Sequence, residues 1–361
     1  MRVTRFQVSG VRRLESVSLE PGPVLNLFVG DNGAGKSSLL EALHLMAYGR
    51  SFRGRVRDGL VRTGAEAVEV FVEWSEGPEN RLRRAGLRHT GQSWNGRLDG
   101  ATVTQLGELC AALAVVSFEP GSHALITGGG DTRRRFVDWG LFHVEQEFMP
   151  IWRRYARGLK QRNAVLKTGG STAQLDAWDH ELAEAGERLT DSRERYLEQL
   201  EPVLRSVAAG LVPSLGNLTL DFVPGWRRSE MSLMDAYLLA RERDRMLGYT
   251  TVGPHRGDWR VGYAELPQQE PLSRGQAKLT ALSCLLAQAM DFADRRGEWP
   301  IIALDDLPSE LDRRHQQRVL EWVLGSGAQL FITSTEPSMV LQEMGVDATL
   351  FHVEQGAIHA A

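Results

Sequence analysis

Cysteine and long hydrophobic runs are both scarce in this sequence. The two cysteines, Cys110 and Cys284, stand far apart and form no metal-ligand spacing, so we expect neither a disulfide framework nor a cysteine-bound metal. No apolar run reaches the about 18 residues of a membrane-spanning helix. The N-terminal stretch MRVTRFQVSG lacks the apolar core of a signal peptide. These absences predict a cytoplasmic protein that does not associate with membranes.

An excess of positive charge is also missing. The 42 lysines and arginines face 46 acidic residues, and a net charge of −4 is not typical of a nucleic-acid-binding protein. The distribution is less even, because residues 150–170 hold six basic residues and no acid, and residues 50–62 hold five arginines and one acid. These runs indicate either solvated faces of an arginine-rich protein or a surface for an anionic partner.

The order of predicted elements indicates a helical segment inserted into an α/β domain. A chain of 361 residues is long enough for about two domains. Residues 1–128 have the pattern of short strands around one helix at 36–47, with WNGR at 94–97 as a hairpin turn. Residues 129–248 have helical periodicity, and strands alternating with helices return in 249–361. We therefore predict a discontinuous α/β head (1–128 and 249–361) with a mixed, largely parallel sheet, and an inserted, mainly helical lobe (129–248).

Three shorter segments refine this organisation. NLTLDFV, at 217–223, is typical of a lone strand within the helical lobe, and WRVGYA, at 259–264, of a strand in the head. TGGSTAQ, at 168–174, predicts a break between two helices, with Ser171 or Thr172 as the cap of the second helix.

The stretch VLNLFVGDNGAGKSSLLEAL carries a phosphate-binding loop between a strand and a helix. Gly30 and Gly35 permit a tight loop whose backbone N–H groups point at phosphate oxygens, and the helix N-terminus adds a favourable dipole. Lys36 would reach the β- and γ-phosphates, and the Ser37 hydroxyl would bind Mg²⁺. A chance glycine-rich turn is the weaker interpretation. We assign ATP binding to Gly30, Asp31, Asn32, Gly33, Ala34, Gly35, Lys36, Ser37 and Ser38.

A pair of carboxylates ends the apolar strand in PIIALDD. A buried strand that ends in Asp305 and Asp306 needs a cation to neutralise them, whereas such a pair standing alone is often a surface turn. Asp305 suits a water-mediated Mg²⁺ contact, and Asp306 can orient or deprotonate the attacking water. We therefore assign catalysis to Lys36, Asp305 and Asp306, and the metal to Ser37 and Asp305. The wide gap from Lys36 to Asp305 is explained by the inserted lobe.

Another anion-binding turn opens the helix predicted from Gly275. In PLSRGQAK, Ser273 and the backbone N–H groups of Gly275 and Gln276 stand at a helix N-terminus. The order of this turn, an apolar strand and an aspartate pair resembles ABC-type ATPases, in which the turn contacts the γ-phosphate held by the partner subunit. A plain helix cap is the alternative for Ser273 alone. We assign this signature, acting in trans, to Ser273, Arg274, Gly275 and Gln276, and a D-loop at the dimer interface to Ser309, Glu310, Leu311 and Asp312.

These motifs resemble the RecF family of bacterial recombination and repair proteins. The similarity runs the length of the chain and includes GDNGAGKSSLLEAL, GRSFR, RRRFVDWGLFH, YARGLKQRNAVLK, GYTTVGPHRGD, LSRGQAKL and LDDLPSELD. RecF-like proteins are similar to the SMC class of ATP-dependent clamps, with a short helical arm in place of a long coiled coil. The resemblance implies an ABC/SMC-type P-loop ATPase head with an inserted helical arm.

The resemblance also implies ATP-dependent homodimerisation on DNA, with a weak DNA-dependent ATPase activity that resets the dimer. It implies ATP and Mg²⁺ as cofactors, double-stranded or gapped DNA as ligand, and RecR- and RecO-type proteins as partners. Recombinase loading at single-strand gaps, replication-fork maintenance and the SOS response belong to the same inference. The two basic runs would then contact DNA phosphates. The candidate contacts are Arg50, Arg53, Arg55, Arg57, Arg153, Arg154, Arg157, Lys160 and Arg162.

Three segments depart from related patterns. VRR stands at 11–13 where many family members have Phe-Arg-Asn, and FEPG at 118–121 has glycine in place of an acidic residue. ABC transporters have a switch histidine after the last core strand, whereas this chain has FITSTE. The candidates for that γ-phosphate contact are Thr333, Ser334 and Thr335.

Three other protein classes compete with this interpretation. An ABC transporter-type ATPase subunit usually carries its signature closer to the P-loop and lacks a helical insert of this size. A nuclease related to overcoming-lysogenisation proteins would append an acidic metal-binding domain, for which the stretch after Asp312 is short. A small-molecule kinase would need the P-loop but not the turn at 273–276.

Overall fold

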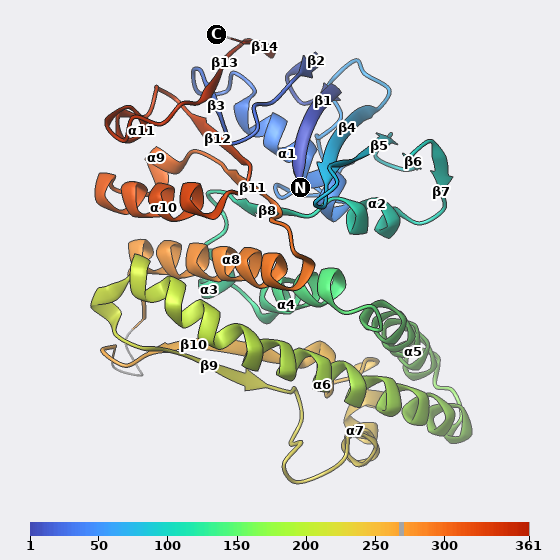
Figure 1. The fold of residues 1–361 in the computed structure, drawn as a ribbon. Coiled ribbons are helices and arrows are strands. Elements are labelled where there is room, and N and C mark those ends of the chain that lie inside the picture. The colour runs from blue at the N-terminus through green and yellow to red at the C-terminus, as the bar shows by residue number, and fades with distance from the viewer. Residues whose placement is uncertain (267–270, 361) are drawn as a thin grey trace. The chain divides into compact units, whose positions relative to one another are not determined.

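The computed structural model of the protein describes residues 1–266 and 271–360. Its contacts divide the chain into two compact units, which are a head unit (Met1–Ser122 and Leu282–Ala361) and an arm unit (His123–Ala281) (Figure 1). The sequence-based boundaries, after 128 and after 248, differ from this division. The main reason is that the strand expected at 259–264 in the head pairs instead with the strand predicted at 217–223, so both belong to the arm unit.

One sheet of the head unit is parallel except at one edge. Its strand order is β14-β13-β3-β12-β11-β8, and only β13 and β14 pair antiparallel, which agrees with the mixed sheet predicted from the sequence. Because β3, β12 and β11 are parallel neighbours, their carboxyl ends meet at one edge of the sheet. The bounds are β3 (Leu25–Val29), β8 (Val115–Phe118), β11 (Ile301–Leu304), β12 (Leu330–Ser334), β13 (Thr349–Glu354) and β14 (Ala357–Ala360).

The second sheet of the head unit is antiparallel throughout. Its strand order is β2-β1-β4-β5-β6-β7, so the chain runs through it largely as a meander. Val68, Val70, Val72 and Trp74 of β4 are buried and alternate with outward-facing residues. The bounds are β1 (Arg2–Val11), β2 (Leu14–Leu19), β4 (Val68–Glu76), β5 (Arg81–His89), β6 (Trp94–Leu98) and β7 (Ala101–Val103).

The hairpin turn predicted at 94–97 is wrong, because these residues form strand β6. Gly96 is there for close packing. A Cβ at this position would lie 2.7 Å from Val103 Cγ2 and 2.8 Å from Leu109 Cδ1. The turn after β6 instead uses Asp99 and Gly100, which have φ of 51° and 88°. The Asn-Gly pair was therefore misinterpreted as a turn. Its glycine is needed because neighbouring side chains pack closely against the strand.

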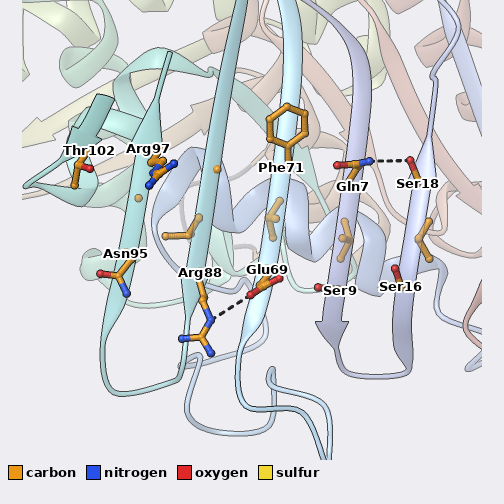
Figure 2. Close-up of a pocket in the computed structure, with 16 residues that line it drawn as sticks. Gln7, Ser9, Ser16, Ser18, Glu69, Phe71, Arg88, Asn95, Arg97 and Thr102 are labelled. Carbon is orange, nitrogen blue, oxygen red and sulfur yellow. Dashed lines mark hydrogen bonds and ion pairs between the residues drawn. The ribbon is translucent and has the colours of Figure 1, made fainter. Parts of the chain in front are cut away.

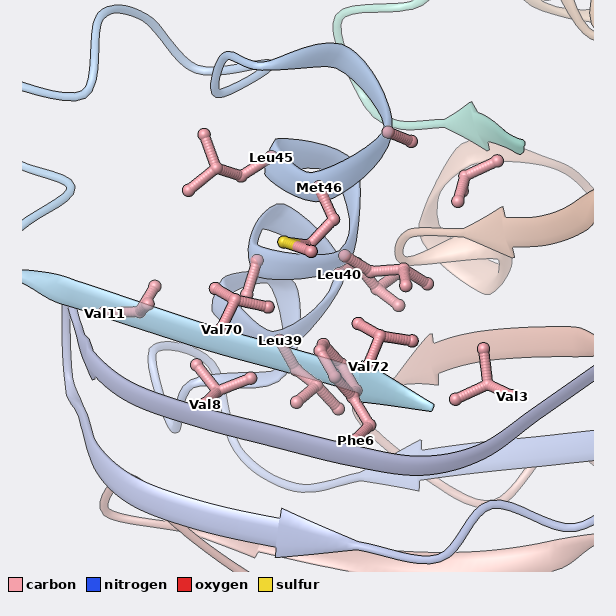
Figure 3. Close-up of a cluster of buried hydrophobic side chains, with 14 of the residues drawn as sticks. Val3, Phe6, Val8, Val11, Leu39, Leu40, Leu45, Met46, Val70 and Val72 are labelled. Atoms are coloured by element: carbon pink, nitrogen blue, oxygen red, sulfur yellow. The ribbon is translucent and has the colours of Figure 1, made fainter. Parts of the chain in front are cut away.

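Helix α1 (Lys36–Tyr48) packs against the inner face of the antiparallel sheet. Figure 3 shows Leu39 and Leu40 among the buried side chains of β1 and β4, such as Phe6 and Val72. The helix ends at Gly49, which has φ of 66° and whose N–H donates to Leu45 O. The phosphate-binding loop is therefore anchored to a rigid helix in the centre of the head unit.

Short helices and one long helix complete the head unit. Among the described residues, no helix combines the length and apolarity needed to cross a membrane. Helix α8 starts one residue before the predicted Gly275, in the arm unit, and ends in the head unit. The bounds are α2 (Leu106–Ala112), α8 (Arg274–Arg296), α9 (Leu307–Glu310), α10 (Arg313–Ser326) and α11 (Met339–Glu343).

The arm unit is mainly helical, as the periodicity of the sequence predicts. The 40-residue helix α6 begins with a capping box in which Ser171 Oγ accepts from Gln174 N, so Ser171 is the cap. The two strands of the arm form an antiparallel pair. The bounds are α3 (Ala124–Thr127), α4 (Gly130–Val144), α5 (Phe148–Thr168), α6 (Thr172–Leu211), α7 (Leu233–Leu247), β9 (Leu218–Val223) and β10 (Asp258–Tyr263), with single 3₁₀ turns at Pro213–Leu215 and Pro254–Arg256.

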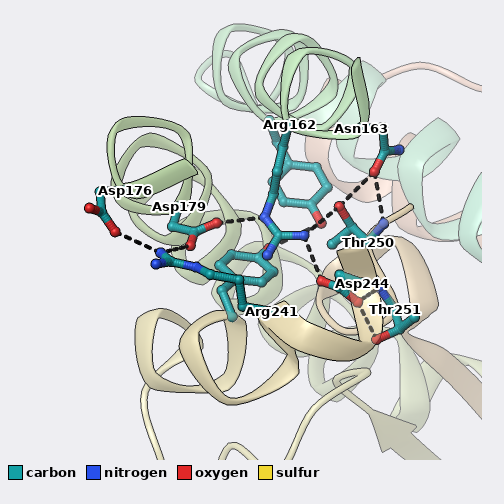
Figure 4. A network of polar contacts seen from close by, with 10 residues as sticks. Arg162, Asn163, Asp176, Asp179, Arg241, Asp244, Thr250 and Thr251 are labelled. Carbon is teal, nitrogen blue, oxygen red and sulfur yellow. Dashed lines mark hydrogen bonds and ion pairs between the residues drawn. The ribbon is translucent and has the colours of Figure 1, made fainter. Parts of the chain in front are cut away.

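A buried arginine links three helices of the arm. Arg162 of α5 is 0% exposed, and its guanidinium donates to Asp179 of α6 at 2.5 Å and to Asp244 of α7 at 2.6 Å (Figure 4). It also donates to Thr250 Oγ1 at 3.0 Å and lies 5.0 Å from the centre of the Tyr237 ring. The assignment of Arg162 as a DNA contact is therefore wrong, because this side chain is committed to the interior of the arm.

We predict that Arg162→Met lowers the free energy of unfolding of the arm by about 3–5 kcal/mol, because two buried carboxylates lose their shared cation. The matched control is Arg154→Met on the same helix. Arg154 pairs with Glu181 and Glu184 at the surface, where a loss below about 1 kcal/mol is expected. Urea unfolding of the two variants checks this difference, and equal losses would contradict a structural role specific to Arg162.

Candidate nucleotide site

The loop between β3 and α1 has the shape of a phosphate cradle. Gly35 has φ of 122° and Gly33 has φ of 76°, which side chains rarely adopt. At Gly30 a Cβ would lie 2.0 Å from Val353 O, so only glycine fits beside β13. Lys36 Nζ donates to Gly30 O at 2.6 Å and to Asp31 O at 2.8 Å, so it spans the loop from inside.

The two aspartates lie at the same edge of the sheet as this loop. Asp305 follows β11 and is 2% exposed. Thr333, at the end of β12, donates its hydroxyl proton to Asp305 Oδ1 at 2.7 Å and accepts from Asp306 N at 2.8 Å. Asp306 has φ of 53°, a left-handed conformation that costs free energy in a residue other than glycine.

A cavity of about 480 Å³ unites these groups within the head unit. Most of the predicted ATP-binding residues line it, and so do Asp305, Asp306 and, of the three candidates after β12, Thr333 alone. Ser334 donates instead to Glu336 O at 2.5 Å. The cavity is lined, among others, by Asn32, Gly33, Gly35, Lys36, Ser37, Ser38, Asp305, Asp306 and Thr333.

Burial shifts the pKa of a basic and of an acidic group in this cavity. It lowers the pKa of Lys36, and this shift is opposed by the nearby carboxylates of Asp306, Asp305 and Asp31. Burial also raises the pKa of Asp305, and the Thr333 and Ser37 hydroxyls and the Arg53 guanidinium oppose that shift. Burial removes water from the charged forms of Lys36 and Asp305 and so disfavours them. A phosphate would stabilise the Lys36 ammonium group, and a cation would stabilise the Asp305 carboxylate.

Two carboxylate oxygens in the cavity meet no donor in the described part of the chain. They are Asp305 Oδ2 and Asp306 Oδ1, and both are buried from solvent. Hard cations such as Mg²⁺ take oxygen ligands, and the Ser37 hydroxyl faces the same space. The residues present therefore fit a magnesium ion bound between the P-loop and the aspartate pair.

The sequence did not indicate that arginines line this cavity. Arg12 donates to both carboxylate oxygens of Glu41, at 2.5 and 2.7 Å, and to Gly59 O at 3.1 Å. Arg13 also lines the cavity. Arg53 was assigned to DNA, but it lines this cavity and lies 4.0 Å from Asp305. Only the tertiary structure brings these side chains to the P-loop.

The segment after β8 contributes to the same environment. Pro120 lines the cavity, and burial and the charge of Asp305 both raise the pKa of Glu119. The Glu119 carboxylate accepts from Gly121 N at 2.5 Å, so the glycine that departs from the family pattern holds this side chain.

The signature turn lies in the arm unit and forms a helix cap. Ser273 N donates to Gln276 Oε1 at 2.8 Å, and Gln276 N donates to Ser273 Oγ at 3.3 Å, which is a capping box on α8. Ser273, Arg274 and Gly275 are exposed, and Gln276 is half-buried. In the single chain, the turn therefore acts as a helix cap, which is the alternative that the sequence left open. Its exposed residues face outward.

The D-loop residues differ in exposure. Ser309 and Asp312 are exposed, Glu310 is half-buried, and Leu311 is 7% exposed. Asp312 is the N-cap of α10, where it accepts from His315 N at 3.1 Å. The exposed members can meet a partner, whereas Leu311 packs inside the head unit.

The remaining predicted DNA contacts are at the surface. Arg50, Arg55, Arg57, Arg153, Arg157 and Lys160 are exposed. Arg154 is half-exposed, and its charge is compensated because it donates to Glu181 at 2.5 Å and to Glu184 at 2.7 Å. The acids on α6 therefore neutralise part of a basic run that has no acid in its own sequence.

Comparison with known proteins agrees with this geometry. Residues 2–359 match the family model described as RecF/RecN/SMC N terminal domain. The DNA replication and repair protein RecF of Stenotrophomonas maltophilia is 63% identical over 364 residues, which is 100% of both chains. A solved structure of the recombination mediator protein RecF with ATP, in the RecFOR pathway, is 25% identical and covers 100% of this chain and 97% of its own, with a TM-score of 0.88. An Smc head bound to the C-winged helix domain of ScpA shares the fold, with 15% identity, the same coverage and a TM-score of 0.57.

We predict that Thr333→Val weakens ATP binding and lowers the free energy of unfolding by about 1–3 kcal/mol, because Asp305 Oδ1 and Asp306 N–H lose a shared partner. Isothermal calorimetry with ATP and urea unfolding measure the two effects. Thr335→Val is the matched control, since Thr335 is half-buried and does not line the cavity. An equal loss of ATP affinity in the control would contradict the role assigned to Thr333.

Proposed function

Since the chain belongs to the RecF family, we propose that it is an ATP-dependent DNA-binding clamp of recombinational repair. The observation that carries the proposal is the meeting of Lys36, Ser37, Asp305, Asp306 and Thr333 in one cavity. An exposed signature turn on the arm unit, at the start of α8, supplies the second half of the site that such an ATPase needs.

The P-loop would hold the phosphates of ATP. Lys36 would exchange its bonds to the loop carbonyls of Gly30 and Asp31 for the β- and γ-phosphate oxygens. Ser37 and Asp305 would ligate Mg²⁺, which when bound neutralises the phosphate charge. The match to an ATP-bound RecF structure supports this assignment.

The dimer would form because each nucleotide needs residues from two chains. The turn from Ser273 to Gln276 offers the backbone N–H groups of Arg274 and Gly275 at the N-terminus of a 23-residue helix, which favour an anion, whereas those of Ser273 and Gln276 take part in the capping box. We infer that it contacts the γ-phosphate held by the P-loop of a second copy. Binding of ATP then stabilises the dimer by mass action.

Hydrolysis would open the dimer. Asp306 Oδ1 meets no donor among the described residues and lines the cavity, so it can accept a hydrogen bond from the attacking water. The Thr333 hydroxyl holds the backbone of Asp306 in place. Loss of the γ-phosphate removes the bridge between the chains. Slow hydrolysis therefore switches the protein from the dimer to separate chains.

DNA would be held through its phosphates by the exposed basic residues of the loop at 50–57 and of α5. Double-stranded or gapped DNA is the ligand that we propose, with RecR- and RecO-type proteins as partners in recombinase loading at gaps. Fork maintenance and the SOS response follow from the same role. The family match over nearly the whole chain favours this clamp over a transporter subunit.

We predict that Ser273→Asp abolishes ATP-dependent dimerisation without unfolding α8. Aspartate still caps the helix, but its carboxylate repels the γ-phosphate of the partner's nucleotide. Analytical ultracentrifugation with and without ATP measures the effect, and Lys36→Met should lose the dimer as well, because it weakens nucleotide binding.

The control for this prediction is Ser171→Asp. Ser171 forms the same capping box on α6 that Ser273 forms on α8, so the two substitutions make the same local change. Wild-type dimerisation of Ser273→Asp would contradict the trans site, and loss of the dimer in Ser171→Asp would attribute the effect to capping.

We also predict that the double variant Arg55→Gln and Arg157→Gln binds duplex DNA more weakly and with a shallower salt dependence. Each lost phosphate contact should reduce the slope of log K against log salt by about 0.9. A salt series with ATP, on gapped and blunt duplexes, measures this slope. Arg154→Gln is the control, because Glu181 and Glu184 already neutralise that arginine, and an equal effect there would contradict the assignment.

A further inference from the structure

The outer face of the antiparallel sheet carries a groove that the nucleotide site does not use. A cavity of about 830 Å³ opens over this face, lined from β1, β2, β4, β5, β6 and β7. Val8, Val70 and Leu87 point to the buried side of these strands, so the strand alternation puts the polar residues on the other side. Figure 2 shows their side chains standing on the open sheet.

The strand register aligns one row of residues across all six strands. Because neighbouring strands are about 4.8 Å apart, the row is about 24 Å long. It runs at right angles to the strands, with Phe71 near its middle. The row consists of Ser18, Gln7, Phe71, Gly86, Arg97 and Thr102.

Gly86 is unexplained by the fold itself. It does not have positive φ, and a Cβ at this position would meet no atom within 4 Å, so neither backbone conformation nor packing requires glycine. A glycine inside a strand weakens the strand and often marks a place where a ligand approaches. Since Gly86 is the direct partner of Phe71, its missing side chain leaves space beside the aromatic ring.

The groups around the ring suit a polynucleotide. Gln7 and Asn95 carry amides that donate and accept, as the edges of bases do. Arg97 lies in the row with Phe71, and Glu69 is compensated by Arg88 at 3.1 Å. In an adjoining row, Arg5 and Arg84 flank Glu73. Of the residues that line the cavity, Arg88 and Arg97 are basic and Glu69 is acidic, and Arg88 also pairs with Glu66 at 3.1 Å.

We propose that this face binds single-stranded DNA, with a base stacked on Phe71 in the space left by Gly86 and the backbone phosphates near Arg97. An aromatic ring on an open sheet, flanked by amides and arginines, is the arrangement by which proteins hold unpaired strands. The row has room for on the order of four nucleotides. The proposal rests on the proposed DNA function and deepens it by placing the unpaired strand of a gap on the head unit.

A protein ligand fits this face less well. A site for an acidic peptide would need hydrogen-bond donors and positive charge. The amides of this face and the hydroxyls of Ser9, Ser16 and Thr102 present hydrogen-bond acceptors as well as donors. A second copy of this chain would need a larger apolar centre than the single ring of Phe71.

The test measures binding of fluorescein-labelled oligo-dT by anisotropy, with blunt duplex of equal length beside it. Gly86→Thr should fill the space beside the ring and weaken oligo-dT binding about tenfold, while thermal stability stays equal or rises, because threonine suits a strand better than glycine. Phe71→Ala should cause a similar loss, and Phe71→Tyr should bind as wild type does. Arg97→Gln should lower the salt slope by about 0.7.

The outcomes separate this inference from the proposed function. Wild-type oligo-dT affinity in Gly86→Thr and Phe71→Ala would overturn the inference, and so would photo-crosslinks from bromodeoxyuridine-substituted oligo-dT that map outside β1, β4, β5 and β6. Loss of self-association with unchanged oligo-dT binding would overturn it in favour of a protein contact. ATP-dependent binding of blunt duplex should be unchanged in these variants, and its absence in the wild type would contradict the proposed function itself.

Discussion

Parallel pairing of β3, β12 and β11 is the constraint on which the nucleotide site depends. The P-loop follows β3, which ends at Val29, and the aspartate pair follows β11, which ends at Leu304. β12 lies between these strands and pairs with both. Its last residues include Thr333, whose hydroxyl bonds to the side chain of Asp305 and to the backbone of Asp306. Because three strands end at one edge, groups that are distant in sequence share one cavity.

Burial of charge recurs in both units and is resolved differently in each. In the arm, Arg162 pairs with carboxylates on two neighbouring helices, which joins α5, α6 and α7, and its Nη2 alone meets no acceptor among the described residues. In the head, Asp305 and Asp306 keep oxygens that no described donor reaches. Opposite charges that pair within the arm stabilise its structure, whereas two neighbouring carboxylates without a cation favour a ligand that brings positive charge.

The sequence predicted what is local and missed what depends on tertiary contacts. The P-loop, the helix from Lys36 and the strand before Asp305 are continuous segments whose pattern can be read directly. Arg162 was taken for a surface residue because a charge run reveals nothing about acids on other elements, such as Asp179 and Asp244. Arg53 is exposed as predicted, but the sequence did not indicate that it lies 4.0 Å from Asp305. The pairing of β10 with β9 is equally non-local and moved the boundary of the arm.

The bonds that Lys36 makes inside its own loop bear on how quickly the site can be reused. Its ammonium group already has two carbonyl partners, at 2.6 and 2.8 Å, so the loop does not rely on a ligand to keep its shape. Binding then exchanges one set of hydrogen bonds for another, and departure of the product restores the first set. Such a loop needs no refolding step between successive cycles, so in the proposed mechanism the meeting and parting of two chains would be the slow events.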